Sequence, residues 1–547
     1  MGSLDIFTAY NNGITVSNPL VMTNYGLVEG MPDVSRSGNT YYSFKGIPYA
    51  KPPTGDLRFA DPQPPEKWNG IKKTKANPMF CIQLMAAVVR SLQNIIPPAG
   101  KEDCLYLSVA TRSLNPHSKL PVAVYIHGGA FVGWGGPSFF RSTFLMDHEM
   151  VVVLVNYRLG PMGFLSFEDD VLPGNFGLKD QVLALQWVRD NIQNFGGDPN
   201  RVTIMGESAG GASVHAHSFS PMSRGLFHQI MPMSGTAYAF WAFAYPGDAR
   251  IMAFEYAKRV GCKGDNSTAV LGCLKKRPVS LLVQGTAQYF GLWDLEPTRH
   301  LGPVSEARRP GAMTPPSPKH WKPVDLPMMV IEASGEGLLK TLLYKSPLRG
   351  RDWKWINKHW DVAIPFSFKF RYNPKHKEIA RRMRQYWFGD KKQLDDSDLK
   401  NFTAMYTTAG IKSPYLHMVE EAKNTVYYLN FGYLGELSPS LLINDPEFPK
   451  LTFHAEYMMY LLHIIFLPKL NGQDLEVSKN LTRMVANFVI HGDPTPKTGE
   501  WQPWSKPGYD TLIMDNKGNR MVREGLPAEV AFFRSLCAYK KFYGCAV

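Results

Sequence analysis

A serine flanked by glycines directly follows a predicted buried strand. The segment Gly206-Glu-Ser-Ala-Gly210 comes after the apolar run Val202–Met205, and the residues that follow it can begin a helix. A tight turn between a strand and a helix projects a serine hydroxyl away from the sheet, and Gly206 and Gly210 leave room for the backbone to close such a turn. We therefore predict that Ser208 is a nucleophile suited to acyl transfer.

The partners that such a serine needs are a histidine base and a carboxylate that orients the histidine. For a serine on a strand-to-helix turn, the acid and then the histidine follow in chain order. Glu336 lies just after the predicted strand Met328–Glu332, and His454 lies after the last predicted buried strand, Val426–Phe431. The residues alone leave rivals, which are Glu332 and Asp325 for the acid and His417 and His463 for the histidine. Because His463 lies in an apolar helical segment, we expect it to pack in the core.

The segment His127-Gly-Gly-Ala-Phe131 follows the predicted strand Pro121–Ile126. Its glycines let backbone N–H groups point into a site, and the tetrahedral intermediate of acyl transfer needs such donors for its oxyanion. We expect the donors to be Gly128, Gly129 and Ala209, the last being the residue after the nucleophile. Taken alone, the segment is equally consistent with an ordinary glycine turn.

The elements around these residues are predicted to be strands that alternate with a helix. The runs Pro121–Ile126, Val151–Asn156 and Val202–Met205 are short and apolar, as buried strands are. Asp180–Ile192 has apolar residues along one side, which is typical of an amphipathic helix. This order predicts an α/β fold with a parallel sheet and right-handed crossovers. The proline-rich stretch 302–327 is either a linker between domains or a long surface loop.

Composition excludes several classes of protein. The 547 residues are 44% apolar, so the chain is not disordered, and six cysteines are too few for a small disulfide scaffold. Most of the net charge of +13 comes from residues 340–392, where 15 Lys and Arg outnumber 4 Asp and Glu. Ile379, Met383, Tyr386 and Trp387 fall on one helical face of this stretch. We therefore favour a solvated helical excursion over a nucleic-acid or other anionic partner.

Membrane and cofactor signals are lacking. No stretch reaches about 18 consecutive apolar residues, so we expect no transmembrane helix. The opening residues MGSLDIFTAY have neither the basic nor the apolar part of a signal peptide, so we expect either a start after a removed signal or a non-native start. No Cys/His cluster has metal-site spacing, and acyl transfer by a serine needs neither a metal nor an organic cofactor.

Longer motifs make the chain resemble the type-B carboxylesterase family, the cholinesterase-like branch of the α/β-hydrolases. The matching segments, in family order, are Phe44–Pro53 (FKGIPYAKPP), Glu102–Leu107 (EDCLYL), Asn156–Gly160 (NYRLG), Gly174–Gln181 (GNFGLKDQ) and the serine turn. The resemblance covers nearly the whole chain. It implies the α/β-hydrolase fold, a mostly parallel central sheet flanked by helices, with loop and helical excursions over an active-site gorge. It also implies one domain, residues 1–547.

The resemblance also assigns roles to site residues. It implies a catalytic triad of Ser208, Glu336 and His454, and an oxyanion hole of Gly128, Gly129 and Ala209. It implies hydrolysis of carboxylic esters through an acyl-enzyme on the serine, and covalent trapping of that serine by organophosphate-type inhibitors. Two other readings are a slow-turnover protein that sequesters esters and a non-catalytic adhesion-type member. The sequence leaves the oligomeric state open.

The cysteines and the glycosylation sequons indicate in which cellular compartment the protein resides. The family pattern implies the disulfides Cys81–Cys104 and Cys262–Cys273 and leaves Cys537 and Cys545 open. Glycosylation sequons begin at Asn266, Asn401 and Asn480. Together with paired cysteines, these sequons favour a protein of the secretory route, with an intracellular location as the alternative.

The substrate is expected to be an uncharged, apolar ester. Cholinesterases carry an aromatic residue for a quaternary ammonium in the loop that the first disulfide closes, but Ile82–Asp103 holds no Trp, Tyr or Phe. Its apolar residues either favour an apolar ester or simply pack the loop, and they are Met85, Val88, Val89, Leu92, Ile95 and Ile96.

Aromatic residues are the candidates for the substrate pocket. Trp241 resembles the acyl-pocket tryptophan of the family. Phe240 and Phe243 are expected either to join it or to be plain core residues, and Phe131 is a further candidate. Glu207 stands where juvenile hormone esterases usually carry glutamine, which weakens a hormone- or odorant-degrading interpretation without removing it.

Overall fold

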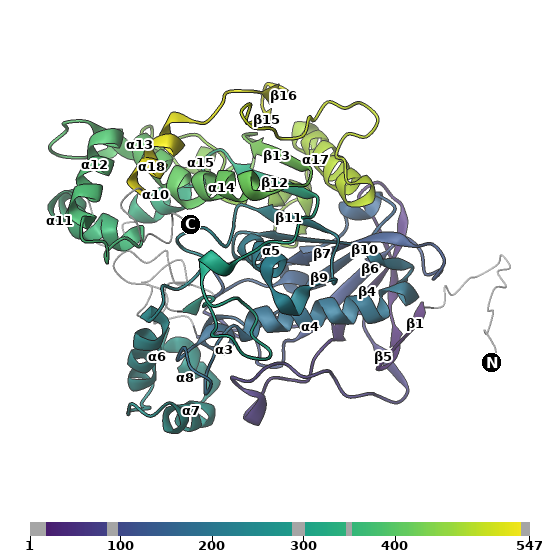
Figure 1. Cartoon of the computed structure of the whole chain (residues 1–547). Coiled ribbons are helices and arrows are strands. Elements are labelled where there is room, and N and C mark those ends of the chain that lie inside the picture. The colour runs from purple at the N-terminus through teal and green to yellow at the C-terminus, as the bar shows by residue number, and fades with distance from the viewer. Residues whose placement is uncertain (1–17, 85–96, 287–300, 346–352, 538–547) are drawn as a thin grey trace.

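The computed structural model describes residues 18–84, 97–286, 301–345 and 353–537, and an 11-stranded sheet forms its centre (Figure 1). From one edge to the other the strands are β16 (Gly518–Val522), β15 (Thr511–Asp515), β13 (Val426–Phe431), β12 (Met328–Ala333), β11 (Gln229–Met233), β10 (Gly197–Glu207), β7 (Leu120–Ile126), β9 (Val151–Val155), β6 (Tyr106–Thr111), β4 (Thr40–Pro48) and β3 (Met31–Val34). Neighbours from β15 to β9 pair in parallel, and the strands beyond them pair antiparallel. Two small sheets lie outside it, β1 (Leu20–Thr23) with β2 (Gly26–Glu29) and β5 (Ile71–Lys73), and β8 (Phe140–Arg141) with β14 (His463–Ile464).

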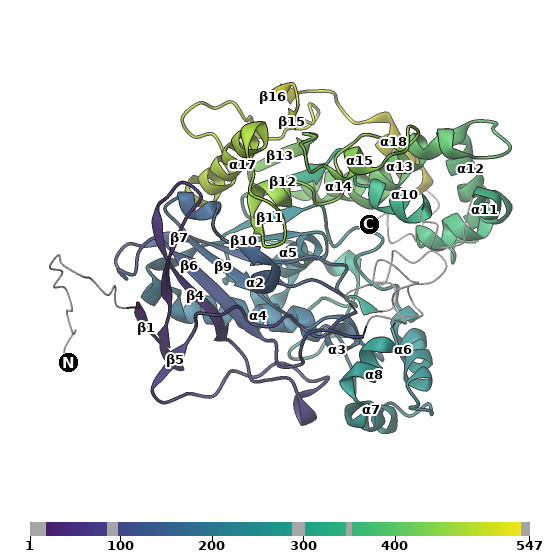
Figure 2. The ribbon, with the colours of Figure 1, turned by 180° about the vertical axis from the view of Figure 1, so that it is seen from behind.

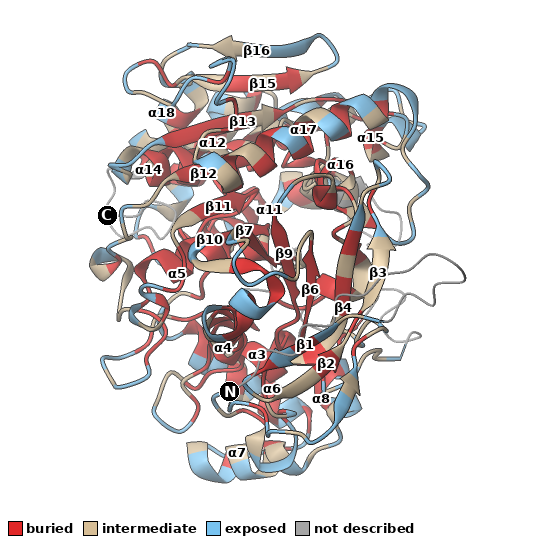
Figure 3. Cartoon of the chain, turned by 90° about the vertical axis from the view of Figure 1, so that its right-hand side faces the viewer, coloured by how far each residue is buried: buried red, intermediate tan, exposed pale blue. Residues whose placement is uncertain are grey.

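Alternating side chains of the central strands fill two separate cores. In β7, Val122, Val124 and Ile126 pack in the cluster that contains α4 (Phe176–Asn191) and α5 (Ala209–Phe219). Ala123 and Tyr125 point to the other face, where α17 (Gly472–His491) packs. Figure 3 shows these strands buried between helices on both sides. Because helices cover both faces of the sheet, side chains on both sides of a central strand are buried, and such a strand is apolar along its whole length.

The predicted strands and helix of the first half are confirmed. The helix expected at 180–192 begins earlier, at Phe176, and carries the predicted apolar stripe into the core. The strands β4, β6, β11 and β15 were not predicted. In β11 the sequence QIMPM contains Pro232 and no β-branched residue apart from Ile230, so its composition gives little strand signal.

Two helical groups lie at the same end of the molecule in both views (Figures 1 and 2). One contains α6 (Asp248–Arg259), α7 (Ser267–Lys276) and α8 (Val279–Gln284). The other contains α10 (Leu338–Lys345), α11 (Trp353–Ser367), α12 (His376–Phe388), α13 (Leu399–Thr407), α14 (Ser413–Glu421) and α18 (Ala528–Cys537). In α12, Ile379 and Met383 are buried as predicted while Arg381 is exposed, but Tyr386 is 42% exposed and stacks on Phe532. The basic stretch is thus a helical excursion with a solvated face.

The proline-rich stretch leads into the central sheet, after the helices α6 to α8. It lies between β11 and β12, which pair in parallel, and it runs close to α5, where the Val324 N–H donates to the Ser218 carbonyl. It is therefore the loop that leads into β12.

The helical placement predicted for His463 is wrong. The helix α16 (Met458–Leu461) ends two residues earlier, and His463 pairs with Arg141 in the small sheet of β8 and β14. The imidazole is half-buried and stacks on Phe144, with 5.7 Å between the ring centroids.

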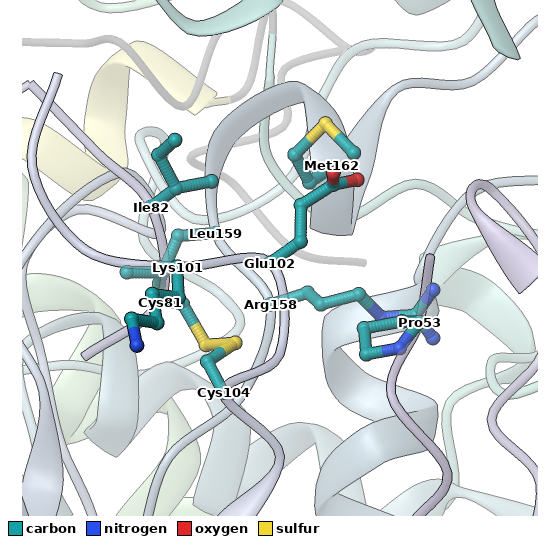
Figure 4. Close-up of a pocket in the computed structure, with 9 residues that line it drawn as sticks. All are labelled: Pro53, Cys81, Ile82, Lys101, Glu102, Cys104, Arg158, Leu159 and Met162. Atoms are coloured by element: carbon teal, nitrogen blue, oxygen red, sulfur yellow. A yellow bond between two sulfur atoms is a disulfide. The ribbon is translucent and has the colours of Figure 1, made fainter. Parts of the chain in front are cut away.

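Charged residues of the long sequence motifs form buried ion pairs. Arg158 makes two hydrogen bonds to the Asp180 carboxylate, of 2.8 and 2.7 Å, and both side chains are almost fully buried. Arg58 likewise makes a bidentate pair of hydrogen bonds with the Glu102 carboxylate. The Arg158–Asp180 pair joins two motif segments, and the Arg58–Glu102 pair joins a third motif segment, next to the Cys81–Cys104 disulfide, to a residue outside the motifs. Figure 4 shows the small cavity there, which Arg158, Glu102 and both cysteines help to line.

Candidate active site

Ser208 occupies the turn between β10 and α5. Its backbone has φ 58° and ψ −119°, a conformation that a residue with a side chain adopts rarely, and its N–H donates to the Met233 carbonyl at 2.8 Å. A Cβ on Gly210 would lie 2.0 Å from the Ile126 carbonyl oxygen, and one on Gly235 would lie 2.0 Å from the Ser208 carbonyl oxygen. The turn is therefore strained and closely packed, and only glycine fits beside it.

His454 lies between Ser208 and Glu336. Its Nε2 is 2.9 Å from Ser208 Oγ, and its Nδ1 hydrogen-bonds the Glu336 carboxylate. The serine and the histidine are 246 residues apart in the chain, and the histidine and the acid are 118 apart. With Nδ1 donating to the acid, Nε2 is free to accept the serine proton. The structure thus brings together all three residues that the sequence proposed.

Glu336 is fixed by further hydrogen bonds that sequence analysis missed. The Ala333 N–H donates to its Oε1 at 2.8 Å, and the Ser234 hydroxyl donates to the same oxygen. Tyr457 in turn donates to Ser234 Oγ at 2.6 Å. Ser234 directly follows β11, so recognition of that strand would have placed a polar residue at the same sheet edge as the nucleophile.

The rivals for the acid and the base lie elsewhere. Glu332 is buried on β12 and accepts from the Asn430 amide at 2.9 Å. Asp325 is exposed in the loop before that strand. His417 lies on α14, with its Nε2 3.7 Å from a Glu421 oxygen.

Two carboxylates adjust the proton affinity of His454. Burial alone would lower the pKa of His454, but the charge and hydrogen bond of Glu336 and the charge of Glu207 raise it above its ordinary value. Glu207 Oε1 lies 3.7 Å from His454 Nε2. Burial raises the pKa of Glu207 to about 7, against the opposing effect of His454. The site therefore stabilises an imidazolium, which is the charge that forms when histidine takes the serine proton.

The glycine segment after β7 lies against Glu207. The Glu207 carboxylate packs directly against Gly128, where an added Cβ would lie 2.4 Å from Glu207 Oε2. Gly129 and Ala130 have left-handed backbone, with φ of 103° and 55°. Ala209 is the first residue of α5, where an N–H has no partner within the helix. The backbone N–H groups of this segment and of Ala209 are candidates for binding a negatively charged oxygen.

Three of the predicted pocket aromatics differ in exposure. Phe131 is fully buried and packs edge-on against Phe164. Phe240 is 3% exposed and packs on Phe368 among the helices of the α11–α13 group. Trp241 is half-buried, and its indole N–H donates to the Gly410 carbonyl at 2.9 Å. Of the three, Trp241 is the one with surface left to offer a ligand.

Both predicted disulfides are present. Cys81 bonds Cys104, and Cys262 bonds Cys273. The side chains of Cys537 and Cys545 and the apolar residues 85–96 lie outside the described part of the chain. Among the sequon residues, Asn266 and Asn401 are exposed and Asn480 is half-buried on α17. In the described ranges, no helix is long and apolar enough to cross a membrane.

Comparisons with known proteins bear on the family and the fold. A model described as the carboxylesterase family matches residues 17–533. The juvenile hormone esterase of Tribolium castaneum is 35% identical over 509 residues, which cover 88% of this chain and 85% of that protein. The medium-chain fatty acyl-CoA hydrolase precursor of Anas platyrhynchos is 39% identical over 517 residues, covering 88% and 86%. The crystal structure of juvenile hormone esterase from Manduca sexta, with OTFP covalently attached, superposes with a TM-score of 0.82 at 24% identity and covers 95% of this chain and 100% of that one, which shows a shared α/β-hydrolase fold.

Proposed function

Since the chain belongs to the carboxylesterase family, we propose that Ser208, His454 and Glu336 are the catalytic triad with which this serine carboxylic ester hydrolase acts. The observation that carries the proposal is the line of hydrogen bonds from the serine hydroxyl through the imidazole to the buried carboxylate. The continuous sheet on both sides of the proline-rich loop, together with the family match over residues 17–533, supports one catalytic domain.

The reaction proceeds by two acyl transfers. Ser208 Oγ attacks the ester carbonyl carbon while His454 Nε2 takes the hydroxyl proton, and Glu336 stabilises the imidazolium. His454 then gives that proton to the alkoxy oxygen as its bond to carbon breaks, and the alcohol leaves. Water attacks the acyl-enzyme with the same proton transfers, which releases the acid and restores the serine.

The oxyanion is bound by backbone N–H groups of Gly129 and Ala209, and we assign the third donor to Ala130. Gly128 was expected as a donor from the sequence, but the Glu207 carboxylate packs directly against it, so we propose Ala130 in its place. The left-handed backbone of Ala130 continues the turn that Gly129 begins. Each such donor typically contributes about 3 kcal/mol to transition-state stabilisation.

The preferred substrate is an uncharged, apolar ester. Trp241 offers half-buried aromatic surface for an acyl group, with Phe131 as the buried wall behind the glycine segment. The related medium-chain fatty acyl-CoA hydrolase supports an apolar acyl chain. A hormone-degrading esterase is the second candidate, because a juvenile hormone esterase is 35% identical. Glu207 in place of glutamine speaks against that second candidate.

The secretory route is the proposed location. Two disulfides and the exposed sequon residues Asn266 and Asn401 support it, because disulfides persist in oxidising compartments. Protein expressed in secreting animal cells should lose mass on treatment with an N-glycosidase. Full-length protein of unchanged mass would favour the intracellular alternative.

The first test compares wild type with Ser208→Ala on p-nitrophenyl esters from acetate to octanoate. Loss of the nucleophile should lower kcat by about 10⁶-fold, and the best chain length measures the acyl pocket. Ser535→Ala, at an exposed serine of α18, is the control that should keep full activity.

Other outcomes of this experiment distinguish the alternative functions. One product per chain without steady turnover would indicate an ester-sequestering protein. No activity in either protein would leave an adhesion-type role. An organophosphate should inactivate the wild type and add its mass to the peptide containing Ser208, and inactivation without that adduct would contradict the assignment of the nucleophile.

A further inference from the structure

A buried carboxylate lies two residues after the histidine and takes no part in the proposed proton transfers. Glu456 is 3% exposed. Its Oε2 accepts a 2.6 Å hydrogen bond from the Phe453 N–H, and its Oε1 accepts one from the Ser438 hydroxyl. Both carboxylate oxygens are therefore occupied by donors, one of them on the residue just before His454.

These bonds close the turn that presents the imidazole. The Glu456 N–H donates back to the Phe453 carbonyl at 3.0 Å, so His454 and Ala455 form the corner of a four-residue turn. Ala455 has φ 64°, a left-handed conformation that is unfavourable for a residue with a Cβ. The turn needs outside support to persist, and the paired bonds between residues 453 and 456 supply it.

Glu456 also fastens this turn to a neighbouring segment. Ser438 lies at the start of α15 (Pro439–Leu442) and accepts a 2.9 Å hydrogen bond from the Gly435 N–H. On the other side of the turn, Tyr457 reaches Ser234 and through it the triad acid. The histidine is thus held from two sides, by Tyr457 toward Glu336 and by Glu456 toward Ser438.

Burying a carboxylate at this position is energetically unfavourable. Burial raises the pKa of Glu456 to about 7, and the charge of Asp474 contributes in the same direction. Asp474 is also buried, but it accepts from the Tyr433 hydroxyl at 2.7 Å and from the Glu436 N–H at 3.2 Å. Neither partner belongs to the turn of His454, so the two neighbouring acids serve different segments.

We propose that Glu456 is a positioning residue for His454: its buried carboxylate closes the 453–456 turn and fastens it to Ser438, which keeps the imidazole aligned between Ser208 and Glu336. This inference rests on the proposed triad. A displacement of about 1 Å of a catalytic group can cost about 100-fold in rate. The cost should be largest where His454 must protonate a poor leaving group.

The experiment measures kcat/KM for two esters that share an acyl group, p-nitrophenyl butyrate and ethyl butyrate. p-Nitrophenolate leaves without a proton, whereas ethoxide needs the proton of the imidazolium. The variants are Glu456→Ala, which removes both acceptors, and Glu456→Gln, which keeps an acceptor for the Phe453 N–H. Asp474→Asn is the matched control, a buried acid of the same cluster with no bond to the turn.

We expect Glu456→Ala to lower kcat/KM by about 10-fold on the p-nitrophenyl ester and about 100-fold on the ethyl ester. Glu456→Gln should restore both to within about 3-fold of wild type. Asp474→Asn should lower the melting temperature and leave the ratio of the two esters unchanged. A loss of folded protein alone would reduce both esters by the same factor.

Equal reductions on the two esters, or no reduction, would overturn the proposal. If Glu456→Ala does not fold, Ser438→Ala decides, because it removes only one of the two partners of the carboxylate. In Ser438→Ala, kcat/KM for ethyl butyrate should fall by about 3-fold more than kcat/KM for p-nitrophenyl butyrate. An unchanged ratio of the two kcat/KM values would overturn the proposal. A wild type inactive on both esters would instead contradict the proposed function.

Discussion

Tyr457 donates a 2.6 Å hydrogen bond to Ser234, whose hydroxyl donates in turn to the triad acid Glu336. All three side chains are buried. Since Ser234 follows β11 and Tyr457 follows the histidine turn, this chain of bonds connects the two segments that must hold the acid and the base in register.

Replacement of Tyr457 by phenylalanine should remove the bond that orients the Ser234 hydroxyl and leave the ring in place. We expect kcat to fall by about 3- to 10-fold with KM unchanged, because one neutral hydrogen bond in the support of Glu336 is lost. Steady-state kinetics on p-nitrophenyl butyrate measures this. Tyr460→Phe is the control, since no hydrogen-bond partner of the Tyr460 hydroxyl is found among the described residues. Equal losses in the two variants would contradict the role of Tyr457.

The charge of Glu207 should set the acid limb of the pH profile. His454 must be neutral to act as a base, so activity is present above its pKa and is lost as the pH falls through it. Glu207 contributes to raising that pKa. In Glu207→Gln the pKa of His454 should fall, and the acid limb of kcat/KM should move to lower pH.

The control for that pH experiment is another pair of histidine and glutamate. Glu421 lies 3.7 Å from His417, the same separation as between Glu207 and His454, but His417 belongs to α14 and has no bond to the triad. Glu421→Gln should leave the profile unchanged. An acid limb that stays in place in Glu207→Gln would show that Glu207 does not act on the base.

Replacement of Gly235 by alanine should distort the backbone turn that carries Ser208. The added Cβ would lie 2.0 Å from the Ser208 carbonyl oxygen, and the atoms it meets are backbone, so no flexible side chain can move away. We expect Gly235→Ala to lower kcat by about 100-fold or more. Gly272→Ala is the matched control, because Gly272 is an exposed residue of α7 where an added Cβ would meet no atom within 4 Å, and it should stabilise the protein by up to about 1 kcal/mol. Kinetics and thermal unfolding of both variants check this pair.

Loss of Arg158 should destabilise the fold without touching the triad. Arg158→Met leaves the fully buried Asp180 carboxylate without its partner, which should cost about 3–5 kcal/mol in the free energy of unfolding. Arg189→Met is the control at an exposed pair with Asp190 and should cost no more than about 1 kcal/mol. Urea unfolding followed by fluorescence measures both. A cost for Arg158→Met no larger than that of the exposed pair would show that Asp180 is stabilised by other groups.

The serine turn could be predicted because the strand, turn and helix that carry it are consecutive in the chain, although Met233 at the end of the neighbouring strand and Gly235 just after it support the turn. Strand, turn and helix lie within residues 197–219, and each is encoded by the residues it contains. The five apolar runs that were predicted as strands are strands, since both faces of the sheet are covered and the signal is a continuous apolar run. The disulfides came from family resemblance, and the structure has both.

What only the tertiary structure decided is which distant groups meet. Spacing left Glu336 and Glu332 open as the acid, and the choice depends on which carboxylate the sheet edge turns toward His454. The supporting roles of Ser234 and Tyr457, and the bond from Ser438 to Glu456, leave no local pattern, because these partners are more than 15 residues apart in the chain. The packing of the Glu207 carboxylate against Gly128 was likewise invisible in the sequence, since it depends on the tertiary arrangement of β10 and the glycine segment. The chain's own pattern thus determined the most apolar buried strands, the helix before the serine and the nucleophile, whereas packing between elements determined how the base is held and how its proton affinity is adjusted.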